Sequence, residues 1–478
     1  MTPEFPCLQI GRVTVEAATP LSIGTGLGSG LADMALVRDA NGLPAIPGTT
    51  IAGVLRHLYA ECYGQTKTNH LFGQAHRNFE QASRLVLSWG CVHDQNDSPV
   101  EGLLVGSNSG KLTSDPLLAW AIKDQPLVRD HVRINDRGST DGRGKFDRTV
   151  LPAGYRFTFE AVLWCADKAD NSLENALGLM KLPAFRLGGA TRRGLGKLEV
   201  KRVAVVCFDL RVKEDRERLA LLSNHLAATP GKLGDRPGFT QLPLNAPKTD
   251  AKHYKITLEP LDFWRMGKGD HPAAQTRDGK AADLIPLREP CVTWSAAANG
   301  SQTGKISARR LVVAGSAIKG ALRHRAMFHK RRLSGCFADK CPADEFRAWQ
   351  MNTLTDPDIE CLFGSANDDE GRGGETGAEE GQAGLVLIDD AYVVDGKVGI
   401  MPHSSVDRLT QGVRHGFLFH EELVVNGEIV LQVAILHPNR VSRTAMKALE
   451  NAMQDLVSGR LPIGGGSGKG HGFCKGKV

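Results

Sequence analysis

Asp33 is the residue near the N-terminus whose type and setting suggest chemistry. It follows a run of glycines at Gly24, Gly26, Gly28 and Gly30, and glycines let a backbone approach another molecule closely. A carboxylate in such a loop could bind a divalent cation, or accept the proton of a ribose 2′-hydroxyl as that oxygen attacks the neighbouring phosphate. The alternative is a loop carboxylate that caps a turn, which is a common use of Asp. The residues alone leave both interpretations open.

Two Gly-rich basic segments place many backbone donors beside cations. The first holds Gly188, Gly189, Arg192, Arg193, Gly194 and Gly196, and the second holds Gly464, Gly465, Gly466, Gly468, Lys469 and Gly470. Such turns bind a sugar-phosphate backbone without reading bases. The second segment is not a nucleotide-binding P-loop, because Ile463 stands where the first Gly of that motif belongs and Gly470 replaces its hydroxyl residue. We therefore predict phosphate contacts at Arg192, Arg193 and Lys469.

A third motif occurs twice. The stretch PGTTIAGVLRH at residues 47–57 returns as AGSAIKGALRH at residues 314–324. Each copy reads as a sharp Gly turn, a small hydroxyl residue that can cap a helix, and an apolar stripe. Free N–H groups at such a helix start, with a basic residue nearby, can hold a phosphate; for one copy alone, the plainer interpretation is a helix packed on a sheet. The residues chosen for phosphate contact are Gly48, Thr49 and Arg56 in the first copy, and Gly315, Ser316, Lys319 and Arg323 in the second.

Other blocks recur in the same order around this motif. LADMALVRD returns as AADLIPLRE, HLFG as CLFG, and RLVLSWGCVHD as GLVLIDDAYVVD, before a hairpin and the Gly-rich turn also return. Chance similarity would not preserve this order, so we interpret the chain as a duplication. The segment 228–252 is rich in Pro, Gly and Lys and is the predicted linker. The predicted units are residues 1–227 and 253–478.

The elements that must position these residues have one order in both units: strand, loop, helix, strand, hairpin, strand, helix, Gly-rich turn and strand. Strands separated by helices, with one long hairpin, indicate an α+β fold. The order favours two tandem ferredoxin-like (RRM-like) βαββαβ units, each with an inserted hairpin. Many RNA-binding domains use this scaffold, but a scaffold alone does not establish function.

Composition fits an ordinary globular protein, with 41% hydrophobic and 23% charged residues, and not a disordered or membrane-spanning chain. The N-terminal sequence lacks the features of a signal peptide, so we expect a cytoplasmic protein without a membrane partner. The net charge of +6 is mild and does not by itself indicate a nucleic-acid partner. Aromatic residues make up only 6% of the chain, which argues against base-stacking platforms.

One group of residues has the chemistry of a metal site. His329, Cys336, Cys341 and Cys361 follow the second copy of the helix motif with the spacing H-x6-C-x4-C-x19-C. One imidazole and three thiolates are suitable ligands for a closed tetrahedral Zn²⁺ site. Because the spacing is irregular, isolated packed cysteines are the alternative. The corresponding insertion of the first unit has only Cys62 and His70, and we predict no site there.

Taken together, these motifs resemble the RAMP superfamily of CRISPR-associated proteins, and more narrowly the backbone subunits of type III effector complexes. Two units in one chain are similar to the fused backbone subunits of variant type III systems. The resemblance implies subunits that stack along a guide RNA and a loop Asp that cuts the paired target RNA. It places that Asp at Asp33 and, through the match of LADMALVRD with AADLIPLRE, at Asp283. It also implies a divalent cation such as Mg²⁺ for cleavage, with guide RNA, complementary target RNA and other CRISPR effector subunits as partners.

The resemblance further implies that the hairpin in each unit is a thumb that displaces one nucleotide. In the first unit this is the basic hairpin of residues 132–150, where Arg133 and Arg137 are predicted RNA contacts, and its counterpart contributes Arg408. Such a segment is usually a hairpin exposed to solvent. The alternative is a wedge that unstacks a nucleotide and holds its phosphates.

We therefore expect a guide-RNA-binding backbone subunit that acts as a metal-dependent endoribonuclease within a ribonucleoprotein complex of antiviral defence. Two alternatives stay open. The first is a non-catalytic RNA-binding scaffold subunit. The second is an endoribonuclease that processes the guide precursor, for which a general acid–base pair such as His with Tyr or Lys is expected, and no such pair stands out in the sequence.

Overall fold

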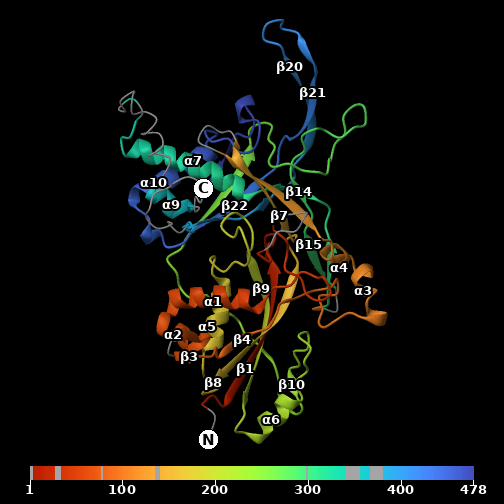
Figure 1. Ribbon diagram of the computed structural model, residues 1–478, viewed down its shortest axis with the longest axis vertical. Helices are drawn as coiled ribbons and strands as arrows, with labels where there is room; N and C mark the ends of the chain where they lie inside the picture. The colour runs from red at the N-terminus through yellow and green to blue at the C-terminus, as the bar shows by residue number, and fades with distance from the viewer. Residues whose placement is uncertain are drawn as a thin grey trace.

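The computed structural model of the protein describes residues 4–26, 34–76, 79–134, 140–297, 300–337, 339, 356–365 and 381–478. Two α+β units lie one above the other in Figure 1, with the N-terminal unit below. Three residues singled out in the sequence, Asp33, Arg137 and Cys341, lie outside the described residues.

An antiparallel sheet forms the centre of the first unit. Its strands lie in the order β12-β9-β1-β8-β4, and β5 also pairs with β8. The order of β9, β1, β8 and β4 is that of a βαββαβ ferredoxin-like fold, which has its first and third strands in the middle. The strands are β1 (Cys7–Ala17), β4 (Leu85–Leu87), β5 (Cys91–Val92), β8 (Arg156–Cys165), β9 (Leu198–Asp209) and β12 (Thr240–Gln241), and the crossing helices are α1 (Gly48–Tyr63) and α5 (Ser172–Gly178).

The second unit repeats this arrangement. Its sheet has the order β18-β22-β13-β23, so its first strand (β13) and third strand (β22) are again central. These strands are β13 (Lys252–Pro260), β18 (Val386–Ile388), β22 (Ile429–Ile435) and β23 (Cys474–Lys477), and the helices α7 (Gly315–Leu333) and α10 (Arg443–Val457) pack against them. The prediction of two ferredoxin-like units is confirmed.

Both faces of the first sheet are covered. Side chains alternate along β1, so Val13 packs in the core under the helices, while Leu8 and Ile10 pack on the opposite face with Leu233 and Phe239. These last two residues belong to the segment 228–252, the predicted linker. This segment therefore forms a layer over the first sheet before it reaches the second unit.

Hydrogen bonds and short strands hold that layer in place. The buried guanidinium of Arg12 donates to the carbonyl oxygens of Ser223 and His225, at 2.5 and 2.6 Å. Strand β12 pairs with β9 and so extends the sheet. The elements of this layer are α6 (Lys213–Ala220), β10 (Lys232–Leu233), β11 (Arg236–Pro237) and β12.

Smaller elements surround the two sheets. In the first unit they are α2 (Gln65–Phe72), β2 (Gln74–His76), β3 (Phe79–Gln81), α3 (Lys111–Ser114) and α4 (Pro116–Ala121). In the second unit they are β14 (Arg288–Glu289), β15 (Val292–Ala296), β16 (Gln302–Ile306), β17 (Arg310–Val313), α9 (Pro357–Phe363) and β19 (Ala391–Tyr392).

Each unit carries the expected long hairpin between its second and third sheet strands. The first is formed by β6 (Leu127–Ile134) and β7 (Thr140–Val150), and the second by β20 (Val398–Val406) and β21 (Val413–Val424). In Figure 1 the β20–β21 hairpin projects from the top of the molecule, whereas β7 runs from the first unit towards the second. The two hairpins therefore have different surroundings, although they occupy the same place in their units.

A second connection runs in the opposite direction. The β15–β16 hairpin of the second unit packs against the first unit, where Val292 joins the hydrophobic core. Its backbone N–H donates to Ala153 O at 2.8 Å, and the indole Nε1 of Trp294 donates to Gly154 O at 2.8 Å. Each unit thus sends a hairpin to the other.

The repeated helix motif has a steric reason for its glycine. A Cβ atom on Gly48 would clash with the carbonyl oxygen of Leu87 at the end of β4, and one on Gly315 would clash with that of Ile388 at the end of β18. Each helix start therefore lies directly on the neighbouring strand. From there the helix directs its apolar stripe, such as Ile51 in α1 and Ile318 in α7, into the core of its unit.

Two substitutions in α1 test this explanation. Gly48→Ala forces a methyl group into backbone, so we expect it to lower the free energy of unfolding by about 1–3 kcal/mol. Gly53→Ala in the same helix, where a Cβ atom would meet nothing within 4 Å, should raise it by about 0.5–1 kcal/mol. Denaturant unfolding measures both, and equal effects of the two substitutions would contradict the steric role of Gly48.

Candidate functional site

The Gly-rich turn of the first unit, residues 186–197, is called the first turn and docks on the second unit. Its Gly194 has a φ of +110° and lies against the start of α7, where a Cβ atom would clash with Asp390. The N–H of Gly315 donates to Asp390 Oδ1 at 2.7 Å. Gly315 was predicted as a phosphate contact, but its N–H is already bonded within the protein. The first turn and the second helix motif, which were predicted separately as phosphate-binding elements, thus meet at one junction.

Buried ion pairs hold this junction together. Asp389 lies 2.5 Å from Arg186 Nη2 and 2.8 Å from Lys197 Nζ, which are the two ends of the first turn. Arg129 of β6 bonds both Glu289, at 2.5 Å, and Asp390. Burial would lower the pKa of Arg129, but Asp390 and Glu289 raise it above its ordinary value. Burial raises the pKa of Asp390 to about 6, against the opposing effect of Arg129.

A group of cations gathers beside these pairs. We call it the junction cluster; it consists of Arg192, Arg193, Lys319 and Arg323. Lys319 is only 7% exposed and donates to Val386 O at 3.1 Å. Burial, together with the positive charges of Arg192, Arg193 and Arg323, lowers the pKa of Lys319 to about 7.

The positive charge of the junction cluster is largely uncompensated. Arg192 donates to the carbonyl oxygen of Gly384, and the acidic residue that acts on it at longer range is Glu61. Among the described residues, no carboxylate forms an ion pair with the side chain of Arg193 or Arg323. Cations held close together in a partly buried place favour the binding of an anion. The sequence predicted the members of the junction cluster one by one, and the structure brings them together from two units.

The corresponding place in the first unit is less basic. Arg56 matches Arg323, but its guanidinium lies 3.4 Å from both Phe72 O and Asn69 Oδ1 and so closes the end of α2. Ala52 stands where α7 has Lys319. Thr49 is exposed near the helix start. The two helix motifs share their backbone role, but only the second has a cluster of cations.

Asp283 lies at the base of the β20–β21 hairpin. Its exposed carboxylate accepts a hydrogen bond from the backbone N–H of His420 at 2.7 Å and lies 4.0 Å from His420 Nδ1. The next residue, Leu284, accepts from the N–H of Glu422 at 2.8 Å. In the first unit, Met34 O accepts from Thr149 N at 3.3 Å in the same way. Asp33, just before Met34, lies outside the described residues.

The remaining predicted RNA contacts are spread over the hairpins. Lys469 lies beside the base of β21, with Nζ 3.9 Å from Glu421 Oε2 and 5.1 Å from the centre of the Phe419 ring. Arg408 is exposed near the tip of the β20–β21 hairpin, and Arg133 lies on β6. These residues do not belong to the junction cluster.

Cys341, one of the four residues proposed to bind Zn²⁺, lies outside the described residues. His329 is buried on α7, and its Nε2 lies 2.7 Å from Asp455 Oδ2, while its Nδ1 has no hydrogen-bond partner among the described residues. A carboxylate on one nitrogen and a free second nitrogen fit a metal-binding histidine. In the described part of the chain, no group of three or more His, Cys, Asp or Glu residues could hold a metal ion. Cys336 and Cys361 are partly exposed, and zinc stays a prediction.

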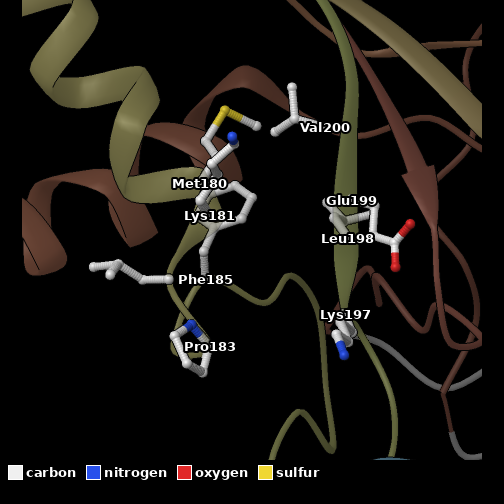
Figure 2. Close-up of a pocket in the computed structure, with 9 residues that line it drawn as sticks. Met180, Lys181, Pro183, Phe185, Lys197, Leu198, Glu199 and Val200 are labelled. Carbon is white, nitrogen blue, oxygen red and sulfur yellow. The ribbon is translucent and has the colours of Figure 1, made fainter. Parts of the chain in front are cut away.

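A cleft of about 340 Å³ lies next to the first turn. Figure 2 shows Met180, Pro183 and Phe185 on one side and the strand Lys197–Val200 on the other, with the Glu199 carboxylate directed away from the cleft. Lys197 is already paired with Asp389. The cleft therefore offers mainly apolar walls and no acid–base pair.

The sequence did not reveal the residues that hold the junction together. The second unit has Asp389 and Asp390 after its second strand, where the first unit has Ser88 and Trp89. This difference between the two copies is the feature of the sequence that could have indicated the junction. An acidic pair after the second strand that has no counterpart in the other copy indicates a contact made by one unit only.

The comparison with models of protein families supports the same assignment as the fold. The model of the RAMP superfamily matches residues 14–199 and 303–475, which include the second and third sheet strands, the two crossing helices and the Gly-rich turn of each unit. The match covers well over half of the chain, and the protein belongs to the RAMP superfamily of CRISPR-associated, RNA-binding proteins. A search among curated proteins gave no match. No helix in the described ranges is long and apolar enough to cross a membrane.

The buried ion pairs lead to a prediction about stability. Arg129→Ala leaves Glu289 and Asp390 buried without their partner, so we expect the free energy of unfolding to fall by about 3–5 kcal/mol. The control is Arg211→Ala, which removes a 2.7 Å contact with Asp209 on the surface and should have little effect on the free energy of unfolding, because solvent screens exposed pairs. Urea unfolding followed by circular dichroism measures both. A small, equal loss in the two variants would show that the buried pairs do not stabilise the junction.

Proposed function

We propose that this chain is a guide-RNA-binding backbone subunit of a type III CRISPR effector complex that cleaves target RNA in antiviral defence. The observation that supports RNA binding most strongly is the junction cluster. Phosphates of a nucleic-acid backbone would neutralise these cations, and binding would release counterions. Few aromatic side chains are available for stacking, so the sequence of the target would be read by pairing with the guide.

Partner subunits would bind at two surfaces, the Gly-rich turn of the second unit and the start of α1 in the first unit. Within the chain, Gly194 of the first turn packs on the start of α7, whereas the matching Gly470 of the second unit has nothing within 4 Å of the position of a Cβ atom. The start of α1 likewise lacks a turn from a preceding unit among the described residues. We therefore propose other CRISPR effector subunits as the partners of these two free surfaces.

Target cleavage is assigned to Asp33 and Asp283. Asp283 is fixed by a backbone hydrogen bond at the hairpin base, and 61% of its side chain is exposed, so RNA can reach it. A carboxylate with substrate phosphate oxygens can hold Mg²⁺, and the bound cation would stabilise charge on the phosphate under attack. The chain itself would position the phosphodiester through the hairpin and the second Gly-rich turn, which contributes Lys469.

The cleavage proposal predicts separate losses at two positions of the target. Asp283→Ala should abolish one cut and Asp33→Ala another, each by at least about 100-fold, because each removes the only proposed catalytic carboxylate of its unit. Asp278→Ala, an exposed position in the loop before Asp283, is the control and should cut normally. The measurement is cleavage of labelled target RNA by the guide-loaded complex. Unchanged cleavage in the double variant would identify the chain as a non-catalytic RNA-binding scaffold.

The lowered pKa of Lys319 predicts how RNA binding depends on pH. With a pKa of about 7, Lys319 in the free chain loses its proton as pH rises above 7, while a bound phosphate favours the charged form. RNA binding thus takes up a proton, and affinity for a single-stranded RNA should fall about tenfold between pH 6.5 and 8.5.

Fluorescence anisotropy of the full chain measures this dependence. Lys319→Met should bind more weakly at low pH and lose most of the pH dependence, whereas the exposed control Lys255→Met should keep it. The same pKa shift acts on stability in the opposite direction. Since the unfolded chain binds more protons between pH 7 and the ordinary Lys value of 10.5, stability in the absence of RNA should rise across that range. A pH dependence that survives Lys319→Met would exclude Lys319 as its source.

A further inference from the structure

The two Gly-rich turns have the same backbone. In the first turn, Gly189 N donates to Ser22 O at 2.7 Å and Arg193 N to Ala190 O at 2.8 Å. In the second turn, Gly465 N donates to Arg265 O and Lys469 N to Gly466 O, both at 2.8 Å. The positive φ angles also correspond: +87°, +55°, +110° and +81° at residues 188, 190, 194 and 196, and +81°, +82°, +90° and +85° at residues 464, 466, 470 and 472. The turns can therefore be compared residue by residue.

The hairpin that lies against each turn also matches. Leu21 and Leu151 exchange backbone hydrogen bonds in the first unit, as Trp264 and Val424 do in the second. His131 stacks on Phe146 with 5.0 Å between ring centres, and His403 stacks on Phe419 with 4.9 Å. Arg148 precedes Leu151 by three residues, as Glu421 precedes Val424, so Arg148 and Glu421 occupy equivalent positions in the two units. One position in two equivalent places thus carries opposite charges.

In the first unit this position is a cation for which the described residues provide no anion. Arg148 is 7% exposed, and its guanidinium lies on Gly189 of the first turn, 3.4 Å from the hydroxyl of Ser22. Within the described ranges its Nε has no hydrogen-bond partner, and neither has Nε2 of the neighbouring His131. No carboxylate among the described residues pairs with Arg148. Burial and the nearby Arg193 lower the pKa of Arg148, and burial with Arg129, Arg193 and Arg148 lowers that of His131 to about 4.

In the second unit this position is a carboxylate with cationic partners, although its Oε2 and the Nε2 of His403 make no hydrogen bond to the described residues. Glu421 is 1% exposed, and Arg265 Nε donates to its Oε1 at 2.6 Å. His403 Nε2 lies 3.0 Å from Glu421 Oε2, and Lys469 Nζ lies 3.9 Å from the same oxygen. The guanidinium of Arg265 takes the place on Gly465 that Arg148 takes on Gly189. Glu421 therefore supplies, within the protein, the negative charge that the first unit lacks.

We propose that the first unit binds one phosphate of an RNA backbone between Arg148 and Arg193, beside the first turn, and that the second unit has exchanged this site for the internal carboxylate of Glu421. This inference rests on the proposed RNA-binding function and adds to it that the two units are not equivalent. Arg148 lies in the basic hairpin of residues 132–150, whose basic residues were considered as phosphate ligands, but it was not among the residues chosen as RNA contacts.

The alternative is that Arg148 is a structural residue. A buried guanidinium that stabilises a fold normally has a carboxylate or several carbonyl partners, as Arg129 and Arg12 have here. To the described residues, Arg148 instead has one long hydrogen bond, to the hydroxyl of Ser22. An unpaired buried cation lowers stability, and a bound phosphate removes that cost. Stability and binding should consequently respond to Arg148 in opposite directions, which a structural role would not produce.

The experiment measures both quantities on the full chain. Arg148→Met keeps the packing of the side chain but removes its charge. It should raise the thermal midpoint in phosphate-free buffer and abolish the stabilisation that inorganic phosphate gives to the unmodified chain. It should also weaken binding of an unstructured single-stranded RNA about fivefold and reduce the slope of log affinity against log salt by about 0.7, the value for one phosphate contact. Arg148→Lys should restore most of the slope.

Two further variants complete the test. Arg216→Met removes an exposed arginine on α6 and should change neither the phosphate response nor the salt slope. Glu421→Gln leaves Arg265 and Lys469 without their anion and should increase the slope by up to about 0.7. A lower thermal midpoint for Arg148→Met with unchanged RNA affinity would overturn the inference. If the unmodified chain binds no RNA, the proposed function fails, and the phosphate response still decides whether Arg148 forms an anion site.

Discussion

The buried contact of Arg129 with Glu289 and Asp390 is the interaction on which the arrangement of the two units depends. The three side chains are only 4%, 2% and 2% exposed, and burying such charges is favourable only when each is paired in good geometry. Asp390 also accepts the N–H of Gly315, while the adjacent Asp389 holds both ends of the first turn. One acidic pair thus positions the β6–β7 hairpin, the first turn and the start of α7 together. Without Arg129, Glu289 and Asp390 would lose their cationic partner.

The same pairs bring like charges close to each other. The junction cluster stands directly beside the acidic pair, and the lowered pKa of Lys319 reflects the cost of holding it near Arg192, Arg193 and Arg323. The ion pairs that join the units therefore also hold the cations of the junction cluster close together, where they repel one another. Such a local imbalance is typical of binding sites, where the ligand supplies the missing charge. This explains why a chain with a mild overall charge of +6 can still have a strongly basic place.

The fold could be predicted from the sequence because the duplication tests each pattern twice. Gly48 and Gly315, where a Cβ atom would clash with the neighbouring strand, occupy matching positions in the two copies. The Gly-rich turns also match. The contacts between the units could not be predicted, because they occur only once and join residues distant in sequence, such as Arg129 and Asp390. The segment 228–252 was predicted as a linker from its Pro, Gly and Lys content, yet Leu233 and Phe239 within it are buried on the first sheet. The composition of a segment predicts its flexibility only where the rest of the protein offers no apolar surface that the side chains of the segment can cover.

The two Gly-rich turns separate the contribution of the backbone from that of the side chains. Two of their backbone hydrogen bonds and four positive φ angles correspond, so the two turns have a similar backbone course. The neighbouring hairpin residue has opposite charge in the two units, with Arg148 in one and Glu421 in the other. Backbone donors alone attract an anion weakly, and a buried charge beside them decides whether that anion comes from a ligand or from the protein. Since a buried carboxylate already satisfies the second turn, a phosphate there would have to displace an ion pair. RNA bound along both units should therefore be held more firmly by the first turn, together with the junction cluster, than by the second.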